Sequence, residues 1–190
     1  MKIYIPIGSN CEVSFFLQNN NLRNVAFPFD WNCSSLKSIY EILLNNFDSF
    51  LDDIFIGEAV NRLYFEELEQ GLTKIDNEFI YPVICKKYLI LFPHDYKEVD
   101  NDALVIVKQK YKRRIERFNT YINRDDLEII MIYCNIDFNL NDWQKSVYNK
   151  FNIDIQKENS IYIDKIKEFY KDKPNIKIIS LEDIKLSFQC

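Results

Sequence analysis

The sequence has little of what metal and cofactor sites are usually built from. It contains one histidine, His94, and its five cysteines are scattered along the chain without a Cys-x-x-Cys pair. Because zinc in proteins is held by clustered cysteines and histidines, we expect no metal site. The chain has only three glycines and no Gly-x-Gly-x-x-Gly run, which argues against a dinucleotide-binding loop. We therefore expect a protein that works without a cofactor.

Long apolar runs are also missing. No stretch approaches the roughly 18 apolar residues of a membrane span, and the run that follows Lys2 is too short for the core of a signal peptide. Scattered cysteines in a chain of 190 residues do not indicate a disulfide framework. Acidic residues outnumber basic ones by 29 to 24, which does not favour nucleic-acid binding. We expect a cytoplasmic protein without nucleic-acid or membrane partners, and the sequence does not predict its oligomeric state.

What the sequence does contain is material for a large core, since 47% of its residues are hydrophobic and 15% are aromatic. Apolar runs predict strands at 2–7, 88–92, 127–133 and 176–179, and short strands or a hairpin within 52–86. Helical spacing predicts helices at 11–18, 36–47, 102–123 and 143–151, the second capped by Ser34 or Ser35, and a further helix capped by Ser160. This order predicts one α/β domain over 1–190, with a mostly parallel central sheet covered by helices on both faces.

The turn Gly8-Ser9-Asn10-Cys11 is the first candidate site. It joins the first strand to the first helix, and Gly8 allows a tight turn or a positive φ. Cys11 would lie in the first helical turn, where unpaired N–H groups and the helix dipole favour a nucleophilic thiolate. The alternative is that Cys11 is a small buried hydrophobic residue. We expect that role for Cys33, Cys85 and Cys134, which have apolar neighbours.

A nucleophilic cysteine needs a base, and His94 follows a predicted buried strand directly. If strands 2–7 and 88–92 are parallel neighbours, Cys11 and His94 emerge at the same sheet edge, where α/β folds place their sites. We therefore expect Cys11 to be the nucleophile and His94 the general base. The Cys11 backbone N–H, with the side chain of Ser9 or Asn10, would hold the oxyanion.

Four motifs in order complete this hypothesis: Gly8-Ser9-Asn10-Cys11-Glu12-Val13-Ser14, Pro28-Phe29-Asp30-Trp31, His94-Asp95 and Arg113-Arg114-Ile115-Glu116-Arg117-Phe118. They resemble a family of bacterial and viral proteins that is described as papain-like cysteine peptidases. The resemblance implies Cys–His chemistry and, as an alternative fold, a papain-like α+β arrangement. It also implies Asp30 as the residue that orients His94, with Asp95 as the rival. The predicted function is a thiol-dependent hydrolase or acyl transferase acting on a peptide, an ester or an amide.

The basic residues of the long predicted helix support a competing hypothesis. Arg113, Arg117 and Lys110 lie opposite its apolar stripe on a helical wheel, which is typical of a solvated face. They could instead bind a phosphate, a carboxylate or an acidic glycan, since arginine suits bidentate anion contacts. The chain would then be a non-catalytic module that holds an anion or nucleotide phosphate at the Gly8–Cys11 turn. A structural protein with a degenerate site is a third possibility.

Overall fold

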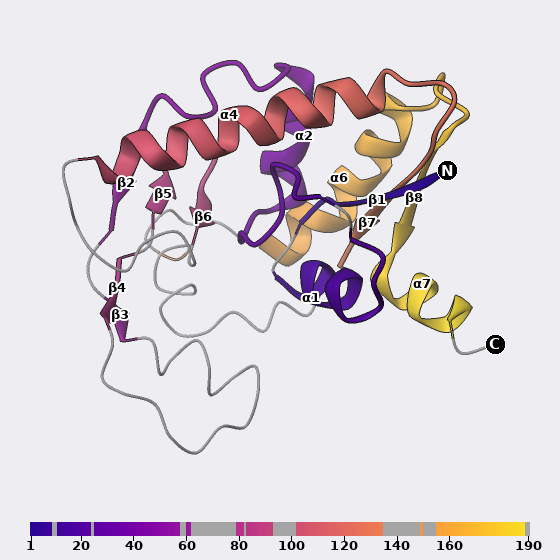
Figure 1. Cartoon of the computed structure of the whole chain (residues 1–190), viewed down its shortest axis with the longest axis horizontal. Helices are drawn as coiled ribbons and strands as arrows, with labels where there is room; N and C mark the ends of the chain where they lie inside the picture. The colour runs from indigo at the N-terminus through magenta and orange to yellow at the C-terminus, as the bar shows by residue number, and fades with distance from the viewer. Residues whose placement is uncertain are drawn as a thin grey trace.

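The computed structural model describes residues 1–8, 11–23, 25–57, 60–61, 79–81, 83–92, 102–134, 149 and 155–188 (Figure 1). Its central feature is a parallel sheet of three strands in the order β1-β7-β8. These strands are β1 (Lys2–Pro6), β7 (Glu128–Tyr133) and β8 (Ile176–Ser180). Ile5 pairs with Met131 of β7, and Ile132 of β7 pairs with Ile179 of β8. The apolar runs of the sequence therefore form the buried strands that were predicted.

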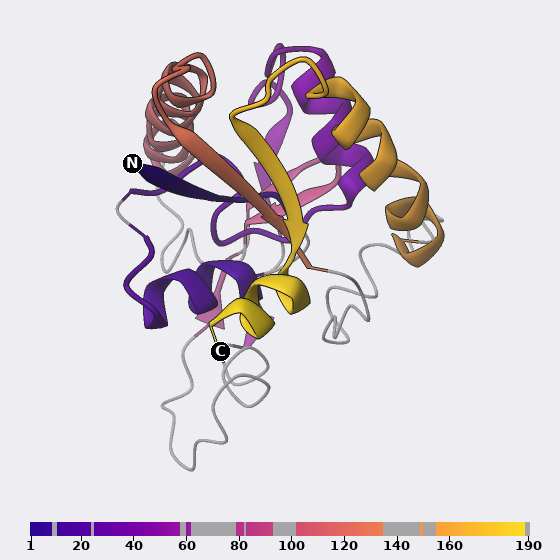
Figure 2. The same cartoon turned by 90° about the vertical axis from the view of Figure 1, so that its right-hand side faces the viewer.

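The two faces of β7 contact different cores because its side chains alternate. Ile129, Met131 and Tyr133 belong to the larger core, and Ile130 and Ile132 to the smaller one. Helices α2 (Leu36–Leu44), α4 (Ala103–Ile122) and α6 (Ile155–Phe169) cover the first face. Helices α1 (Glu12–Asn19) and α7 (Leu181–Ser187) cover the second (Figure 2). The molecule is thus α/β, with helices on both faces of its parallel sheet.

A second sheet is antiparallel, in the order β2-β5-β6. It contains β2 (Ile54–Ile56), β5 (Val83–Cys85) and β6 (Ile90–Phe92), and the two-residue strands β3 (Val60–Asn61) and β4 (Phe79–Ile80) form a separate antiparallel pair. The strands β2, β3, β4 and β5 match the short strands predicted within 52–86, and β6 falls within the strand predicted at 88–92. The parallel pairing of strands 2–7 and 88–92 is wrong, because β1 and β6 belong to different sheets. Only four residues separate β5 from β6, and so short a connection makes β6 the antiparallel partner of β5 in a hairpin.

The C-terminal third needs two further corrections. Helix α6 begins at Ile155, so Ser160 lies inside the helix and does not cap it. The residues between, Gln156-Lys157-Glu158, are good helix formers that let the helix start earlier. Helix α7 was not predicted, although Ser180 caps it by accepting from the N–H of Asp183 at 3.0 Å. The helix predicted over 143–151 falls outside the described residues except for 149. Among the helices that are described, none has the length and apolar character needed to cross a membrane.

Candidate active site

Gly8 ends the first strand in a conformation that suits glycine best. Its φ is +73°, which is the second of the two possibilities expected for this glycine, a tight turn or a positive φ. A Cβ atom here would lie 2.7 Å from Cδ1 of Ile39 and 3.2 Å from the carbonyl oxygen of Ser34. The Gly8 carbonyl accepts from the N–H of Cys134 at 3.3 Å, which extends the β1–β7 pairing into the turn. The turn is therefore packed against the start of α2, while Ser9 and Asn10 lie outside the described residues.

Cys11 occupies the N-cap position of α1, so the prediction that it lies at the helix start is confirmed. Its carbonyl accepts from the N–H of Phe15 at 2.9 Å, which closes the first helical turn. The backbone of Cys11 is already helical, with φ −70° and ψ −8°, and its side chain makes no capping hydrogen bond. The residue is 6% exposed. The thiol thus lies, almost buried, at the carboxyl edge of a parallel sheet, where α/β folds place their ligands.

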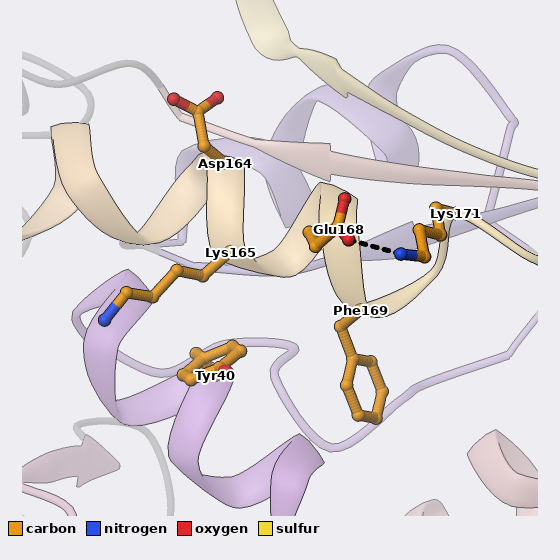
Figure 3. A pocket seen from close by; sticks show the side chains of 6 residues that line it. All are labelled: Tyr40, Asp164, Lys165, Glu168, Phe169 and Lys171. Carbon is orange, nitrogen blue, oxygen red and sulfur yellow. Dashed lines mark hydrogen bonds and ion pairs between the residues drawn. The ribbon is translucent and has the colours of Figure 1, made fainter.

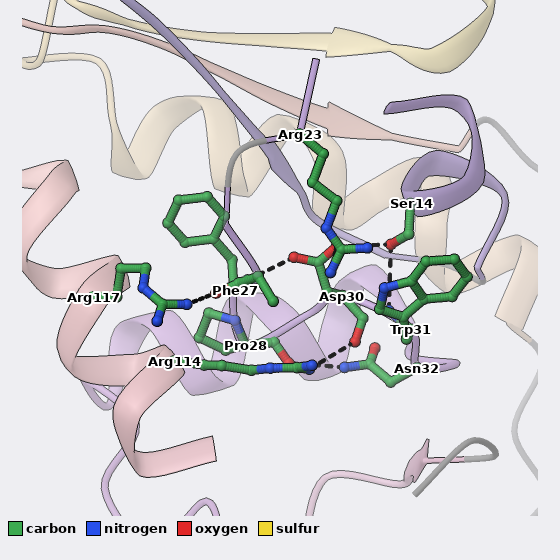
Figure 4. Close-up of polar contacts among 10 residues, drawn as sticks. Ser14, Arg23, Phe27, Pro28, Asp30, Trp31, Asn32, Arg114 and Arg117 are labelled. Carbon is green, nitrogen blue, oxygen red and sulfur yellow. Dashed lines mark hydrogen bonds and ion pairs between the residues drawn. The ribbon is translucent and has the colours of Figure 1, made fainter. Parts of the chain in front are cut away.

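Asp30 is completely buried and has several partners (Figure 4). Its Oδ1 accepts from the Ser14 hydroxyl at 2.9 Å and lies 3.3 Å from the Arg23 guanidinium. Its Oδ2 accepts from the N–H of Phe27 at 2.6 Å. Burial raises the pKa of Asp30, and Arg23, the Phe27 N–H and Ser14 oppose that rise because they stabilise the charged form. Asp30 is thus a buried carboxyl group that its partners hold in place.

The segment that carries Asp30 is irregular backbone whose carbonyl groups are satisfied mainly by side chains. The Asp30 N–H donates to the Phe27 carbonyl, and Asn32 donates to the Pro28 carbonyl at 2.9 Å. From α4, Arg114 donates to the Asp30 carbonyl at 3.2 Å and Arg117 to the Ala26 carbonyl. Buried backbone groups need such partners because an unpaired carbonyl is costly. Helix α4 therefore fixes the turn that presents Asp30.

Tyr111 connects this turn with the end of β6. It is fully buried, its ring centroid lies 4.6 Å from that of Phe92, and the Arg114 guanidinium lies 4.9 Å from its centroid. Burial raises the pKa of Tyr111; Arg114 opposes the rise, whereas the charges of Asp30 and of a thiolate at Cys11 add to it. Tyr111 therefore lies within electrostatic range of both Cys11 and Asp30.

The arginines proposed for anion binding have different surroundings. Arg113 is exposed, and Arg117, which was expected on the solvated face, donates to the Ala26 carbonyl. Arg114 was not singled out from the sequence, yet it contacts both Asp30 and Tyr111. Burial, then Arg114 and Arg113, lower the pKa of Lys110 to about 8. A helical wheel shows which side of α4 a residue is on but not how far a long side chain reaches around it.

Sequence reasoning also missed Ser14 and Arg23, whose side chains, among the described residues, contact the Asp30 carboxylate. Ser14 lies on the buried side of a short helix, and Arg23 follows a polar loop. Neither position has a sequence pattern that indicates a functional site. Arg23 also stacks on Trp31, with 5.1 Å from the guanidinium carbon to the ring centroid. Only the fold brings them together.

His94 and Asp95 lie outside the described residues, as does Cys190. In the part of the chain that is described, no group of three histidine, cysteine, aspartate or glutamate side chains is arranged to hold a metal. Cys33 and Cys85 are buried as expected, and Cys134 is partly buried. Burial raises the pKa of Cys85 to about 11, and burial together with Glu12 raises the pKa of Cys134 to about 12. These two thiols are therefore poor nucleophiles at neutral pH.

Two concave regions differ in their relation to this network. One, of about 440 Å³, lies between α2 and α6 and contacts none of its members (Figure 3). Its lining includes Tyr40, Lys165 and Phe169, with a Glu168–Lys171 ion pair at the edge. The other, of about 400 Å³, is lined by Gln18, Asn21, Arg23, Val25 and Ala26. Through Arg23, only the second of these two regions touches the Asp30 network.

Taken together, these features define an α/β protein with a candidate cysteine site at the carboxyl edge of a parallel sheet. The chain belongs to the family described as "Putative papain-like cysteine peptidase (DUF1796)", whose model matches residues 2–170. An uncharacterised protein of Acanthamoeba polyphaga mimivirus is 26% identical over 121 residues. That match covers 61% of this chain and 54% of the viral protein, so the chain spans about half the length of this relative. No solved structure matches the chain.

Proposed function

We propose that the chain is a thiol-dependent hydrolase or acyl transferase with Cys11 as the nucleophile. The Cys11 thiolate attacks a carbonyl carbon after His94 has taken the thiol proton, and His94 returns that proton to the leaving amine or alcohol. The resulting thioester is released by water or by a second acceptor. The Cys11 backbone N–H, with Ser9 or Asn10, stabilises the oxyanion. A peptide bond is the first substrate class to test, since the family is described as peptidases.

The observation that carries this proposal is the residue at the start of α1. Helices α2 and α7 begin with Ser35 and Ser180, whose hydroxyls cap the helix. Helix α1 has Cys11 instead, and its side chain makes no capping bond. A serine cap stabilises a helix by about 1 kcal/mol, so a cysteine at this position is not explained by helix stability. Helix N-termini also favour thiolates.

A distance argument supports His94 as the base. His94 follows Phe92 by two residues, so its Cα can be no farther than roughly 7 Å from the Cα of Phe92. Phe92 is packed against Tyr111, and Tyr111 is near enough to Cys11 and Asp30 for their charges to act on it. Phe92, two residues before His94, is thus linked through Tyr111 to Cys11 and Asp30, which supports the choice of His94 as the base. We expect the Cys11 sulfur and a His94 ring nitrogen within roughly 3–5 Å of each other.

Asp30 is the proposed orienting residue, with Asp95 as the alternative. A carboxylate has about four acceptor positions, and among the described residues the Asp30 carboxylate has three partners: Ser14, Arg23 and the Phe27 N–H. One position is left for an imidazole N–H. If His94 does not reach it, Asp30 only holds the turn, and the orienting role falls to Asp95 or to a backbone carbonyl.

Selective alkylation tests the proposal. Iodoacetamide at pH 7 should modify Cys11 faster than Cys85 or Cys134, whose raised pKa values keep them protonated, and His94→Ala should slow the reaction at Cys11. The modified positions are identified by mass spectrometry of peptides. In parallel, a library of fluorogenic peptides and simple esters is screened, with Cys11→Ala as the inactive control. A Cys11 that resists modification in the folded protein would be a core residue, and the proposal would fail.

A further inference from the structure

We propose that Ser14 is a positioning residue, which holds the first turn of α1 and thereby the Cys11 thiol in place. This inference rests on the proposed function, because it concerns the same nucleophile. Ser14 is fully buried, and its Oγ donates to Asp30 at 2.9 Å while accepting from the N–H of Trp31 at 3.3 Å. The next residue, Phe15, makes an edge-to-face contact with the Trp31 ring, with 4.7 Å between centroids. Consecutive residues of α1 are therefore fixed to consecutive residues of the Asp30 turn.

A second helix shows what a serine at this position does elsewhere. Ser38 is the third residue after the N-cap of α2, just as Ser14 is the third residue after Cys11. Ser38 turns back to its own cap, with 2.8 Å between its Oγ and the Oγ of Ser35. Ser14 instead uses its hydroxyl to reach another segment of the chain. The helix start that carries the thiol is thus tied to the interior rather than closed on itself.

The contacts of Ser14 and Phe15 with the Asp30 turn matter because α1 is short. A helix of eight residues is marginal on its own and depends on tertiary contacts for its order. Cys11 is linked to the next turn by the hydrogen bond from the Phe15 N–H to the Cys11 carbonyl. Fixing residues 14 and 15 therefore fixes residue 11 one turn away. Since a displacement of about 1 Å can cost about a hundredfold in rate, a positioned first turn is a requirement for catalysis.

Asp30, the residue to which Ser14 donates, is itself held by other partners. Asp30 keeps Arg23 and the Phe27 N–H as partners besides Ser14, and Arg114 of α4 donates to the Asp30 carbonyl. Ser14 therefore bonds to a group that does not depend on Ser14 for its own position. Loss of the Ser14 hydroxyl should loosen α1 before it loosens the Asp30 turn.

The test measures alkylation of Cys11 against pH in Ser14→Ala, in Ser14→Thr and in the matched control Ser38→Ala. We expect Ser14→Ala to slow alkylation about tenfold at pH 7 and to shift its pH profile, and Ser14→Thr to restore the rate, because threonine keeps the hydroxyl. Ser38→Ala removes an equivalent buried helix hydroxyl and should leave the profile unchanged. Adding sucrose at low temperature keeps an unstable variant folded for the measurement.

The outcomes separate the two proposals. A wild-type rate and profile in folded Ser14→Ala, or a slow rate in both Ser14 variants, would overturn the positioning role while leaving the nucleophile in place. A wild-type Cys11 that reacts no faster than Cys85 and Cys134 would instead overturn the proposed function, and the positioning role with it. Equal slowing in Ser38→Ala would mean that any loss of a buried helix hydroxyl has the effect, which also overturns a specific role for Ser14.

Discussion

Helices α1 and α2 start only a short distance apart, because Gly8, just before α1, packs against Ser34 and Ile39 at the start of α2. Helix α2 begins with Ser35 in an extended backbone conformation, and its hydroxyl accepts from the Ser38 N–H at 3.1 Å. Helix α1 begins with Cys11 in a helical conformation and has no such bond. Helix α2 is therefore stabilised locally at its start, whereas helix α1 is stabilised by contacts with the Asp30 turn.

This difference indicates where the molecule gives up local stability. Natural sequences agree with local rules nearly everywhere and depart from them mostly at functional sites. A cysteine in place of a capping serine is such a departure, and the buried bonds of Ser14 and Asp30 compensate for it from outside the helix. The comparison can be tested at Asp30, at Gly8 and at the two cap residues.

The largest effect should follow Asp30→Asn. The asparagine amide places N–H groups next to the Ser14 and Phe27 donors, and it leaves Arg23 without a carboxylate partner. Breaking a buried charged pair costs about 3–5 kcal/mol of stability. Urea unfolding measures this loss. Asp126→Asn is the control, because Asp126 also pairs with an arginine, Arg124, but is exposed and should change stability little.

The same Asp30→Asn sample also decides the role of Asp30 in the site. If Asp30 orients His94, both turnover and alkylation of Cys11 should fall in the folded variant. A loss of stability with unchanged alkylation would remove Asp30 from the catalytic group and favour Asp95. It would also show that α1 keeps its position without the Asp30 charge, contrary to the comparison of the two helices.

A smaller loss, about 2–3 kcal/mol, should follow Gly8→Ala, which combines a positive φ with overlap of the new Cβ. The nearest atom is Cδ1 of Ile39, and Ile39→Val removes that atom. In a double-mutant cycle, Ile39→Val should therefore recover part of the loss, while strain from φ and from the Ser34 carbonyl remains. If the changes in the free energy of unfolding caused by Gly8→Ala and Ile39→Val are strictly additive, the new Cβ at position 8 does not clash with Ile39.

Much of this arrangement could be predicted from the sequence, and the reasons are local. Apolar runs identified β1, β7 and β8, the stripe from Leu104 to Ile122 identified α4, and Ser35 was one of two expected caps. Gly8 and the position of Cys11 followed from a strand, a glycine and an amphipathic run. Each of these signals lies within a few residues of the feature that it predicts.

What could not be predicted depends on residues far apart in the sequence. Ser14 meets Asp30 across 16 positions, and Arg114 meets it across 84. The sequence could not show that β6 pairs with β5 in a hairpin and not in parallel with β1, because a short apolar run does not indicate which strand it pairs with. Cys11, Asp30 and Tyr111 come together only when the strands, the turn and α4 have been packed.

The smallest changes in the free energy of unfolding should come from exchanging the two cap residues. Both residues are buried, Cys11 being 6% and Ser35 3% exposed. Ser35→Cys removes the hydroxyl that accepts from the Ser38 N–H and should lower the free energy of unfolding by about 1 kcal/mol. Cys11→Ser removes no capping bond and should change that free energy by less than about 0.5 kcal/mol, while it abolishes turnover, because a serine hydroxyl is a far weaker nucleophile than a thiolate. Urea unfolding of both variants measures the difference. If Cys11→Ser costs as much as Ser35→Cys, α1 depends on its first side chain as α2 does, and the cysteine would have a structural explanation after all.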